Sequence, residues 1–363
     1  MKSYNHLYEK VIEPENIKEA IRKAAKGKRE RRKVQKILND MDGWIPYYQK
    51  FIQNYKTRHK KPKIIYEGIH RKKREIIVPS FDEQVMHHAI VNVLEPIILR
   101  GIYYHAYGSL PKRGAHGAKK YIEKWIRNDG KNCKYFLKMD IKQFFNSVPH
   151  DKLYAMLEKY IHDAKMMELM HKVIDSTECG LPLGFHTSHW LANWYLQGLD
   201  RYIKQELKAK YYIRYMDDMI IFGPNKKKLR KTRMQIEEYL NSIGLRMKEN
   251  WQIKRFDYKG RGKDLDFMGF RFFQNKTILR RKVMYRMTRR ARRIWRKEKP
   301  TIYDCRQMMS ALGLLDATDT YGMYLEHIKP FINFQKLKRK ISRYDRRVNN
   351  VAQKRKHSKT VGN

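Results

Sequence analysis

Two adjacent aspartates lie in the middle of an apolar stretch of the chain. Asp217 and Asp218 belong to the segment YIRYMDDMIIFG, residues 212–223, whose other members are mostly aromatic or aliphatic. Such flanks are typical of two buried strands joined by a short turn. Burial of two neighbouring carboxylates is costly, because each loses its hydration and repels the other. The pattern therefore predicts a hairpin whose tip carries acidic groups that a cation would neutralise.

A third carboxylate follows an earlier predicted strand. The segment KYFLKMDIKQFF places Asp140 at the end of a run with strand character. Three carboxylates from neighbouring strand ends suit a pair of Mg²⁺ ions. Two such ions stabilise both the attacking and the leaving oxygen of a phosphoryl transfer. The alternative is that the three aspartates only cap turns.

The composition of the chain indicates a polyanionic partner. Among 363 residues there are 81 Lys and Arg against 37 Asp and Glu, so the formal net charge is +44. Nucleic acid is the commonest partner of so basic a protein, and a solvated basic surface is the alternative. Cys133, Cys179 and Cys305 are far apart, which argues against a zinc ribbon or a disulfide framework. The sequence lacks a run of about 18 apolar residues and a signal-peptide core, which predicts a cytoplasmic protein with no membrane partner.

The order of predicted elements indicates an α+β fold with added basic modules. Residues 1–60 have the pattern of basic helices, and residues 61–275 alternate short strands with amphipathic helices. Residues 276–347 are predicted to form a basic helical module. Residues 348–363 have few apolar side chains and are predicted to be a basic tail without stable structure of its own.

Particular elements can be placed within this order. Three strands, 135–141, 211–216 and 218–222, are expected to share one sheet. In the later helical module, Gly313 and Pro330 are expected to interrupt the helices.

Several ordered segments together resemble the reverse transcriptases, and the prokaryotic ones in particular. The pair RYMDD and KMDIKQFF is similar to the palm of these enzymes, which carries a Tyr-X-Asp-Asp turn. The other matching segments occur in the family's order: 74–98, 107–120, 180–200, 236–253 and 265–273. The resemblance implies a right-hand polymerase with fingers, a palm whose antiparallel sheet carries the carboxylates, and a helical thumb.

The resemblance also implies an activity. The chain would be an RNA-directed DNA polymerase of the bacterial cytoplasm that extends a DNA or RNA primer with dNTPs on an RNA template. Its cofactors would be two Mg²⁺ ions, for which Mn²⁺ is a possible substitute. One alternative is a defence-type polymerase that makes repetitive or untemplated DNA. Another is a non-catalytic RNA-binding protein on a palm fold, although that protein would be expected to lack at least one of the three aspartates.

Catalytic roles follow from the same resemblance. Asp140, Asp217 and Asp218 would bind the metals, together with Ile141, which would also contact the nucleotide. Lys248 matches the position that protonates the leaving pyrophosphate, although a solvated lysine fits the sequence as well. Phe145, five residues after Asp140, matches an aromatic gate that excludes the ribose 2′-hydroxyl; core packing is its alternative.

Further residues would bind the nucleotide and the nucleic acid. Fingers cations of the family hold the triphosphate, although surface charge is the alternative for each of Arg74, Lys112 and Arg113. Leu183 and Gly184 lie where the templating pair is checked, and Leu183 cannot hydrogen-bond as Gln does, which predicts lower fidelity. Phe267, Met268 and Gly269 resemble the hairpin that grips the primer, or else belong to an ordinary core. A basic aromatic track for an RNA–DNA hybrid is predicted at Arg289, Arg290, Arg292, Arg293 and Trp295.

One segment bears on the subgroup of the family. GLPLGFHTSHWLAN is most similar to the enzymes of diversity-generating retroelements and of phage or antiphage defence systems, but it departs from them at Phe185, where Asn is expected, and at His189, where Gln is expected. The basic ends of the chain would dock a dedicated non-coding RNA, an accessory protein or further copies of the chain. Diversification, mobility and phage defence all remain open as biological roles.

Overall fold

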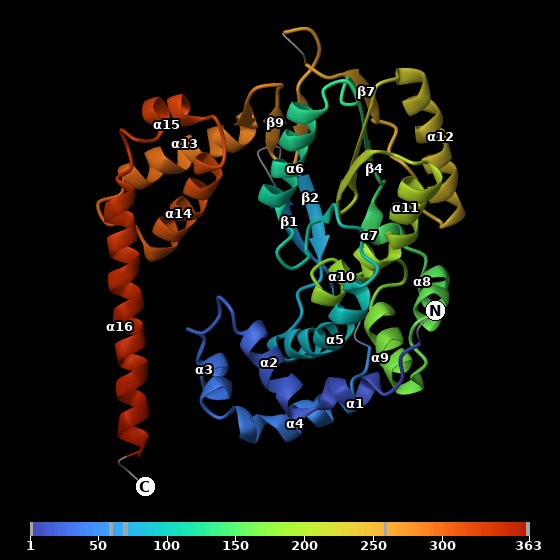
Figure 1. Ribbon diagram of the computed structural model, residues 1–363. Coiled ribbons are helices and arrows are strands. Elements are labelled where there is room, and N and C mark those ends of the chain that lie inside the picture. Colours follow the sequence, from blue (N-terminus) through green and yellow to red (C-terminus); the bar gives the residue numbers. More distant parts are fainter. Residues whose placement is uncertain (1–2, 58–60, 68–71, 258–259, 361–363) are drawn as a thin grey trace. The chain divides into compact units, whose positions relative to one another are not determined.

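A five-stranded sheet carries both of the strand ends that were predicted to be acidic. The computed structural model describes residues 3–57, 61–67, 72–257 and 260–360 (Figure 1). The strand order of the sheet is β3-β5-β6-β4-β7. Its strands are β3 (Ala106–Tyr107), β4 (Tyr135–Asp140), β5 (Tyr211–Tyr215), β6 (Asp218–Gly223) and β7 (Gln252–Arg255).

The register of the sheet follows from its apolar strands. β6 pairs antiparallel with both β4 and β5, whereas the short β3 pairs parallel to β5. The apolar run of β6 from Met219 to Phe222 is buried throughout, as expected for a central strand covered on both faces. The three strands predicted from the sequence are confirmed, with ends that differ by one residue at most.

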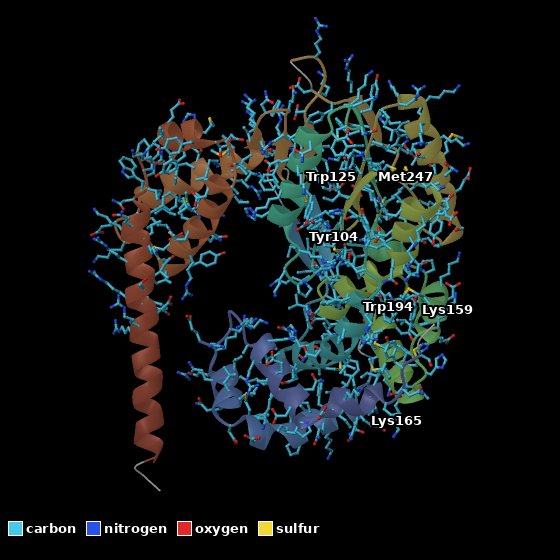
Figure 2. The ribbon with its side chains drawn as sticks, in the orientation of Figure 1. Tyr104, Trp125, Lys159, Lys165, Trp194 and Met247 are labelled. Carbon is cyan, nitrogen blue, oxygen red and sulfur yellow. The ribbon has the colours of Figure 1, made fainter. Side chains whose placement is uncertain are left out.

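Helix α5 (Phe81–Leu99) is the central helix of the same unit. A capping box starts it, because the Ser80 Oγ accepts from the Glu83 N–H at 3.2 Å and the Ser80 N–H donates to the Glu83 carboxylate at 2.6 Å. The helix has apolar residues all round and is largely buried, since it packs against both α2 (Pro14–Ala24) and α10 (His186–Tyr195). Trp194 of α10, labelled in Figure 2, is buried in this core.

The basic N-terminal helices belong to this core rather than to its periphery. They are α1 (Leu7–Ile12), α2, α3 (Arg32–Asn39) and α4 (Met41–Gln53). Their apolar stripes, which include Ile17 and Ile21, are fully buried with α5. Polar contacts add to this packing, because Asp82 of α5 accepts from the Tyr48 hydroxyl at 3.1 Å and from the Lys33 ammonium at 2.7 Å.

Other elements complete the unit around the sheet. Helix α12 (Lys226–Ser242) packs on β4 and β6. A separate hairpin is formed by β1 (Lys63–Glu67) and β2 (Lys72–Ile76). The remaining helices of this unit are α7 (Phe144–Ser147), α8 (His150–Glu158), α9 (Ala164–Ile174), α11 (Gln197–Arg201) and the π-helix η1 (Tyr202–Glu206). Most of α6 (Ala115–Asn128) belongs to the other compact unit of the chain.

The chain divides into two compact units, one of residues 1–118 and 130–254 and the other of residues 119–129 and 255–363. The second unit contains the antiparallel sheet β8 (Leu265–Phe267), β9 (Phe270–Phe272) and β10 (Thr277–Leu279). Four helices follow: α13 (Arg281–Trp295), α14 (Ile302–Asp316), α15 (Tyr321–His327) and α16 (Phe334–Thr360). The expected domain boundaries at residues 60, 275 and 347 stay predictions.

Two details of the second unit differ from expectation. Gly313 does not interrupt a helix, because α14 continues through it to Asp316; one glycine costs a helix only about 1 kcal/mol. Residues 348–360, expected as a tail, continue α16, and residues 361–363 lie outside the described residues. Among the helices that the structure describes, none has both the length and the apolar character needed to cross a membrane.

Candidate active site

Three aspartates gather at one end of the five-stranded sheet. β5 and β6 are joined by the two-residue turn Met216-Asp217, with Tyr215 paired to Asp218. On the other side of β6, Asp218 is paired to Asp140, the last residue of β4. Directly paired residues have Cβ atoms about 5 Å apart, so the fold brings the predicted carboxylates together.

The electrostatics of this cluster favour a bound cation. Burial, reinforced by the neighbouring carboxylates of Asp140 and Asp218, raises the pKa of Asp217 to about 6. The Oδ1 atom of Asp140 is buried and has no hydrogen-bond partner among the described residues. Carboxylate oxygens are the ligands that hard divalent cations prefer, so the donor set fits such ions. Within the described ranges, no three His, Cys, Asp or Glu side chains are already spaced for direct coordination of one ion.

Lys248 supplies a positive charge to the same cluster. Its ammonium forms an ion pair with the Oδ2 atom of Asp140. The backbone fixes this approach, because the Lys248 N–H donates to the Asp140 carbonyl at 2.8 Å. One residue earlier, Met247 (labelled in Figure 2) forms an isolated bridge with Ile141. The structure therefore places Ile141 and Lys248 at the end of β4 that carries Asp140.

Phe145 lies just beyond this strand, in α7. Its ring is partly buried and makes an edge contact with the imidazole of His189 at a centroid distance of 5.2 Å. The preceding Phe144 is 2% exposed and belongs to the core. The Phe145 carbonyl accepts from the Leu181 N–H at 2.6 Å, which ties α7 to the turn that leads to Leu183 and Gly184.

Gly184 is required where that turn meets the residues before α5. The Ile77 N–H donates to the Leu183 carbonyl at 2.7 Å, so the two backbones are in contact. Gly184 has a φ of +111°, and a Cβ atom there would lie 2.2 Å from the Ile77 carbonyl oxygen. Neither the conformation nor the space admits a side chain.

Gly184→Ala is expected to destabilise the protein by about 3 kcal/mol, because backbone strain and the clash act together. Gly313→Ala is the control, since its Cβ meets no atom within 4 Å in α14; it should stabilise by about 0.5–1 kcal/mol. Thermal unfolding followed by circular dichroism measures both variants. An unchanged melting temperature for Gly184→Ala would contradict the requirement for glycine at this position.

The predicted nucleotide-binding cations are in different environments. Arg74 lies in β2, paired with Ile65 of β1. Lys112 is exposed in a turn, with a φ of +57°. The Arg113 guanidinium donates to the Tyr103 carbonyl at 2.8 Å, so it holds its own loop. The cation that the structure pairs with a carboxylate of the cluster is Lys248, through Asp140.

Comparison with known proteins identifies the family. Residues 58–270 match the family described as "Reverse transcriptase (RNA-dependent DNA polymerase)", which is more than half of the chain. The chain belongs to this family. Its α+β architecture is accordingly that of a right-hand polymerase, in which the five-stranded sheet is the palm.

Individual proteins are similar to parts of the chain. The group II intron-encoded protein LtrA of Lactococcus lactis subsp. cremoris is 27% identical over 189 residues, which cover 49% of this chain and 29% of LtrA. The retron Ec73 reverse transcriptase of Escherichia coli is 30% identical over 109 residues, 26% of this chain and 34% of the relative. The chain thus spans about a third of the length of these relatives. A telomerase structure from Candida albicans has 16% identity and a TM-score of 0.47, and the match covers 84% of this chain and 61% of that chain.

The residues predicted to grip the primer form a hairpin tip in the second unit. Met268 and Gly269, with φ of +53° and +88°, join β8 to β9, and Phe267 is fully buried before them. Two positive φ values in a two-residue loop are typical of a type I′ turn. The hairpin form agrees with the family resemblance, while the burial of Phe267 gives its ring a core role.

The predicted nucleic-acid track lies on α13 of the same unit. Arg289, Arg292 and Trp295 are exposed, and the Arg289 guanidinium lies over the Tyr285 ring. Two of the predicted arginines also contact α14, because Arg290 donates to the Gln307 carbonyl at 3.4 Å and Arg293 lies 3.9 Å from the Asp304 carboxylate. The exposed members therefore offer the charge that a nucleic-acid backbone would meet.

Sequence reasoning missed two residues behind the hairpin that carries Asp217 and Asp218. Arg214 of β5 and Asp200 of α11 form an ion pair in which both side chains are fully buried. A signal was present, because Arg214 interrupts the apolar run that precedes the two aspartates. Its partner lies 14 residues earlier on a helix, and the sequence alone gives no reason to join the two.

Proposed function

We propose that the chain is an RNA-directed DNA polymerase that extends a primer 3′-hydroxyl with dNTPs in the presence of two Mg²⁺ ions. The observation that carries this proposal is the convergence of Asp140, Asp217 and Asp218 at one end of the palm sheet. Family membership supports it, since the family's description names RNA-dependent DNA synthesis. Mn²⁺ is the proposed substitute cation.

The three carboxylates of this chain would hold the two cations, which supply Lewis acidity to the attacking and leaving oxygens. Lys248 would act as the general acid, because its ammonium is held beside Asp140. It would donate a proton to the pyrophosphate as that group leaves. Phe145 would lie under the sugar of the incoming nucleotide. Ile141 and Gly184 would contact that nucleotide through their backbones.

Primer extension with the purified full chain tests this proposal. An RNA template of defined sequence, an annealed DNA primer, the four dNTPs and Mg²⁺ are supplied, and the product is sequenced. Extension to the template's end with complementary sequence is expected. Product that is repetitive, or that forms without template, supports the defence-type alternative, and no product at all contradicts the polymerase assignment.

The template is proposed to be a dedicated non-coding RNA of a bacterial retroelement or antiphage system. The net charge of +44 and the exposed cations of α13 support an extended RNA partner, whose binding would weaken steeply with salt. The segment GLPLGFHTSHWLAN supports the diversity-generating or defence subgroup. Sequencing of the RNA that co-purifies with the protein would identify the template and the role.

Domain roles complete the proposal. Residues 61–275 would form the fingers and palm, and residues 276–347 the thumb. The helices of residues 1–60 extend the fingers-and-palm core, with which they share buried side chains. Together with the end of α16, these basic helices are candidates for docking RNA, an accessory protein or a second copy of the chain.

Leu183→Gln is expected to lower the misincorporation rate by roughly fivefold, because one side-chain hydrogen bond to a correctly placed nucleotide contributes about 1 kcal/mol. The Leu183 carbonyl already anchors the turn to Ile77, so the backbone should not move. Sequencing of long reaction products measures the change. Leu183→Met, which preserves size without a donor, is the control, and an unchanged error spectrum for the Gln variant contradicts the idea.

A further inference from the structure

An arginine is buried directly behind the catalytic hairpin. The Arg214 side chain is fully buried, and its guanidinium pairs with Asp200 through two hydrogen bonds, Nε to Oδ1 at 2.8 Å and Nη2 to Oδ2 at 2.6 Å. The Tyr212 hydroxyl donates to the same carboxylate at 2.7 Å. Such a bidentate pair has a fixed geometry, because both groups are planar.

The remaining guanidinium nitrogen contacts the catalytic turn. Arg214 Nη1 donates to the Met216 carbonyl at 3.1 Å and to the Asn193 side-chain oxygen at 3.0 Å. The Asn193 amide donates in turn to the Gly108 carbonyl at 3.1 Å and contacts the Met216 sulfur at 3.4 Å. The Met216 N–H donates to the Tyr107 carbonyl at 3.0 Å. Met216 is therefore held through its N–H, its carbonyl and its side chain.

Met216 is a residue that needs such support. Its φ of +54° lies in the left-handed region, which costs a side-chain-bearing residue about 1 kcal/mol or more. Its carbonyl belongs to the peptide group that leads into Asp217. A hydrogen bond to that carbonyl therefore sets the plane from which the Asp217 carboxylate projects.

We propose that Arg214, anchored by Asp200, is a positioning residue for the catalytic carboxylates. The inference rests on the proposed function, and it adds to that function a device that fixes the direction of Asp217. Arg214 acts through the Met216 peptide, and its own side chain is enclosed by protein. Only a planar fork with several donors serves Asp200, Asn193 and Met216 at once, and a lysine ammonium does not.

The alternative is that the ion pair only stabilises the core. The two roles predict different activities when apolar residues replace the pair. Apolar residues of similar volume often substitute for a buried ion pair without loss of stability. A purely structural pair can thus be replaced by the double variant Arg214→Met/Asp200→Leu with recovery of activity. If the pair positions the carboxylates, the double variant should stay inactive, because it lacks the hydrogen bond to the Met216 carbonyl.

Primer extension by the full-length variants tests this. Arg214→Lys is expected to lower kcat roughly 100-fold, as a displacement of about 1 Å does, and to raise the Mg²⁺ concentration for half-maximal rate. The KM for dNTP should stay within roughly threefold of the wild-type value, because the variant keeps the contacts that bind the dNTP equally in the ground state and the transition state. The apolar double variant should melt near the wild-type temperature but keep a low kcat. Arg233→Lys is the control, since Arg233 pairs with Glu237 at 2.6 Å on α12 and should retain the wild-type kcat.

Each outcome decides between the two roles. Wild-type kcat and Mg²⁺ dependence in a folded Arg214→Lys or double variant overturns the proposal. Asn193→Ala covers the case in which neither folds, because it keeps the ion pair and removes the Asn193 contacts with Met216 and Gly108; kcat should fall roughly tenfold. If its kcat is unchanged, the contacts that hold Met216 and orient the Arg214 Nη1 do not limit catalysis, and the positioning proposal is overturned. An inactive wild type instead contradicts the proposed function.

Discussion

Asp217→Asn is expected to lower the rate of primer extension about a thousandfold or more. Loss of one carboxylate would weaken the proposed cation site, and with it the several kcal/mol by which the cations would stabilise the transition state. About 4 kcal/mol corresponds to a thousandfold change in rate. Single-turnover extension on an RNA template, followed by gel electrophoresis, measures the effect. Retained activity would refute the assignment of Asp217.

The same variant should remain folded, which separates catalysis from stability. Burial and the neighbouring carboxylates raise the pKa of Asp217 to about 6, so the ionised side chain is unfavourable in the metal-free fold at pH 7. A neutral Asn relieves that repulsion, and the melting temperature in EDTA should equal or exceed that of the wild type. Asp316→Asn, an exposed carboxylate at the end of α14, is the control and should change neither activity nor stability.

Phe145→Ala is expected to raise the use of rNTPs relative to dNTPs roughly 100-fold. The partly buried ring lies in the short helix α7, five residues after Asp140, where its edge would clash with a ribose 2′-hydroxyl. A steric clash discriminates by penalising the wrong substrate. Extension with each nucleotide type at matched concentrations gives kcat/KM for both, and their ratio is the measurement.

A ring-retaining variant provides the comparison for this gate. Phe145→Tyr keeps the steric wall and should keep the preference for dNTPs. Loss of the ring should leave the dNTP rate within about tenfold of the wild type, since Phe144 rather than Phe145 fills the core. If the rNTP/dNTP ratio of Phe145→Ala equals that of the wild type, Phe145 packs without gating.

Local patterns were sufficient to predict the acidic end of the sheet. The apolar flanks of Asp217 and Asp218 defined two strands whose burial makes any other register costly, and Asp140 ended a third. Their pairing in one sheet agreed with expectation because sequential strands commonly neighbour one another.

Contacts between distant segments were beyond local patterns. Lys248 meets Asp140 across 108 residues of sequence, and only the family resemblance suggested its place. The partner of Arg214 was unpredictable for the same reason, although a buried arginine always requires one. Gly313 shows the opposite kind of error. A glycine was predicted to interrupt the helix, but the packing of the surrounding residues keeps α14 continuous through it.

The burial of α2 against α5 has a consequence for where the folding unit begins. The segment that carries the family's signature starts at residue 58, but α5, which opens that segment's core, is covered by side chains from residues well before it. A fragment starting at residue 58 would leave a long apolar helix face in water and tend to aggregate. The segment that matches the family is thus shorter than the folding unit, which also needs the helices before residue 58.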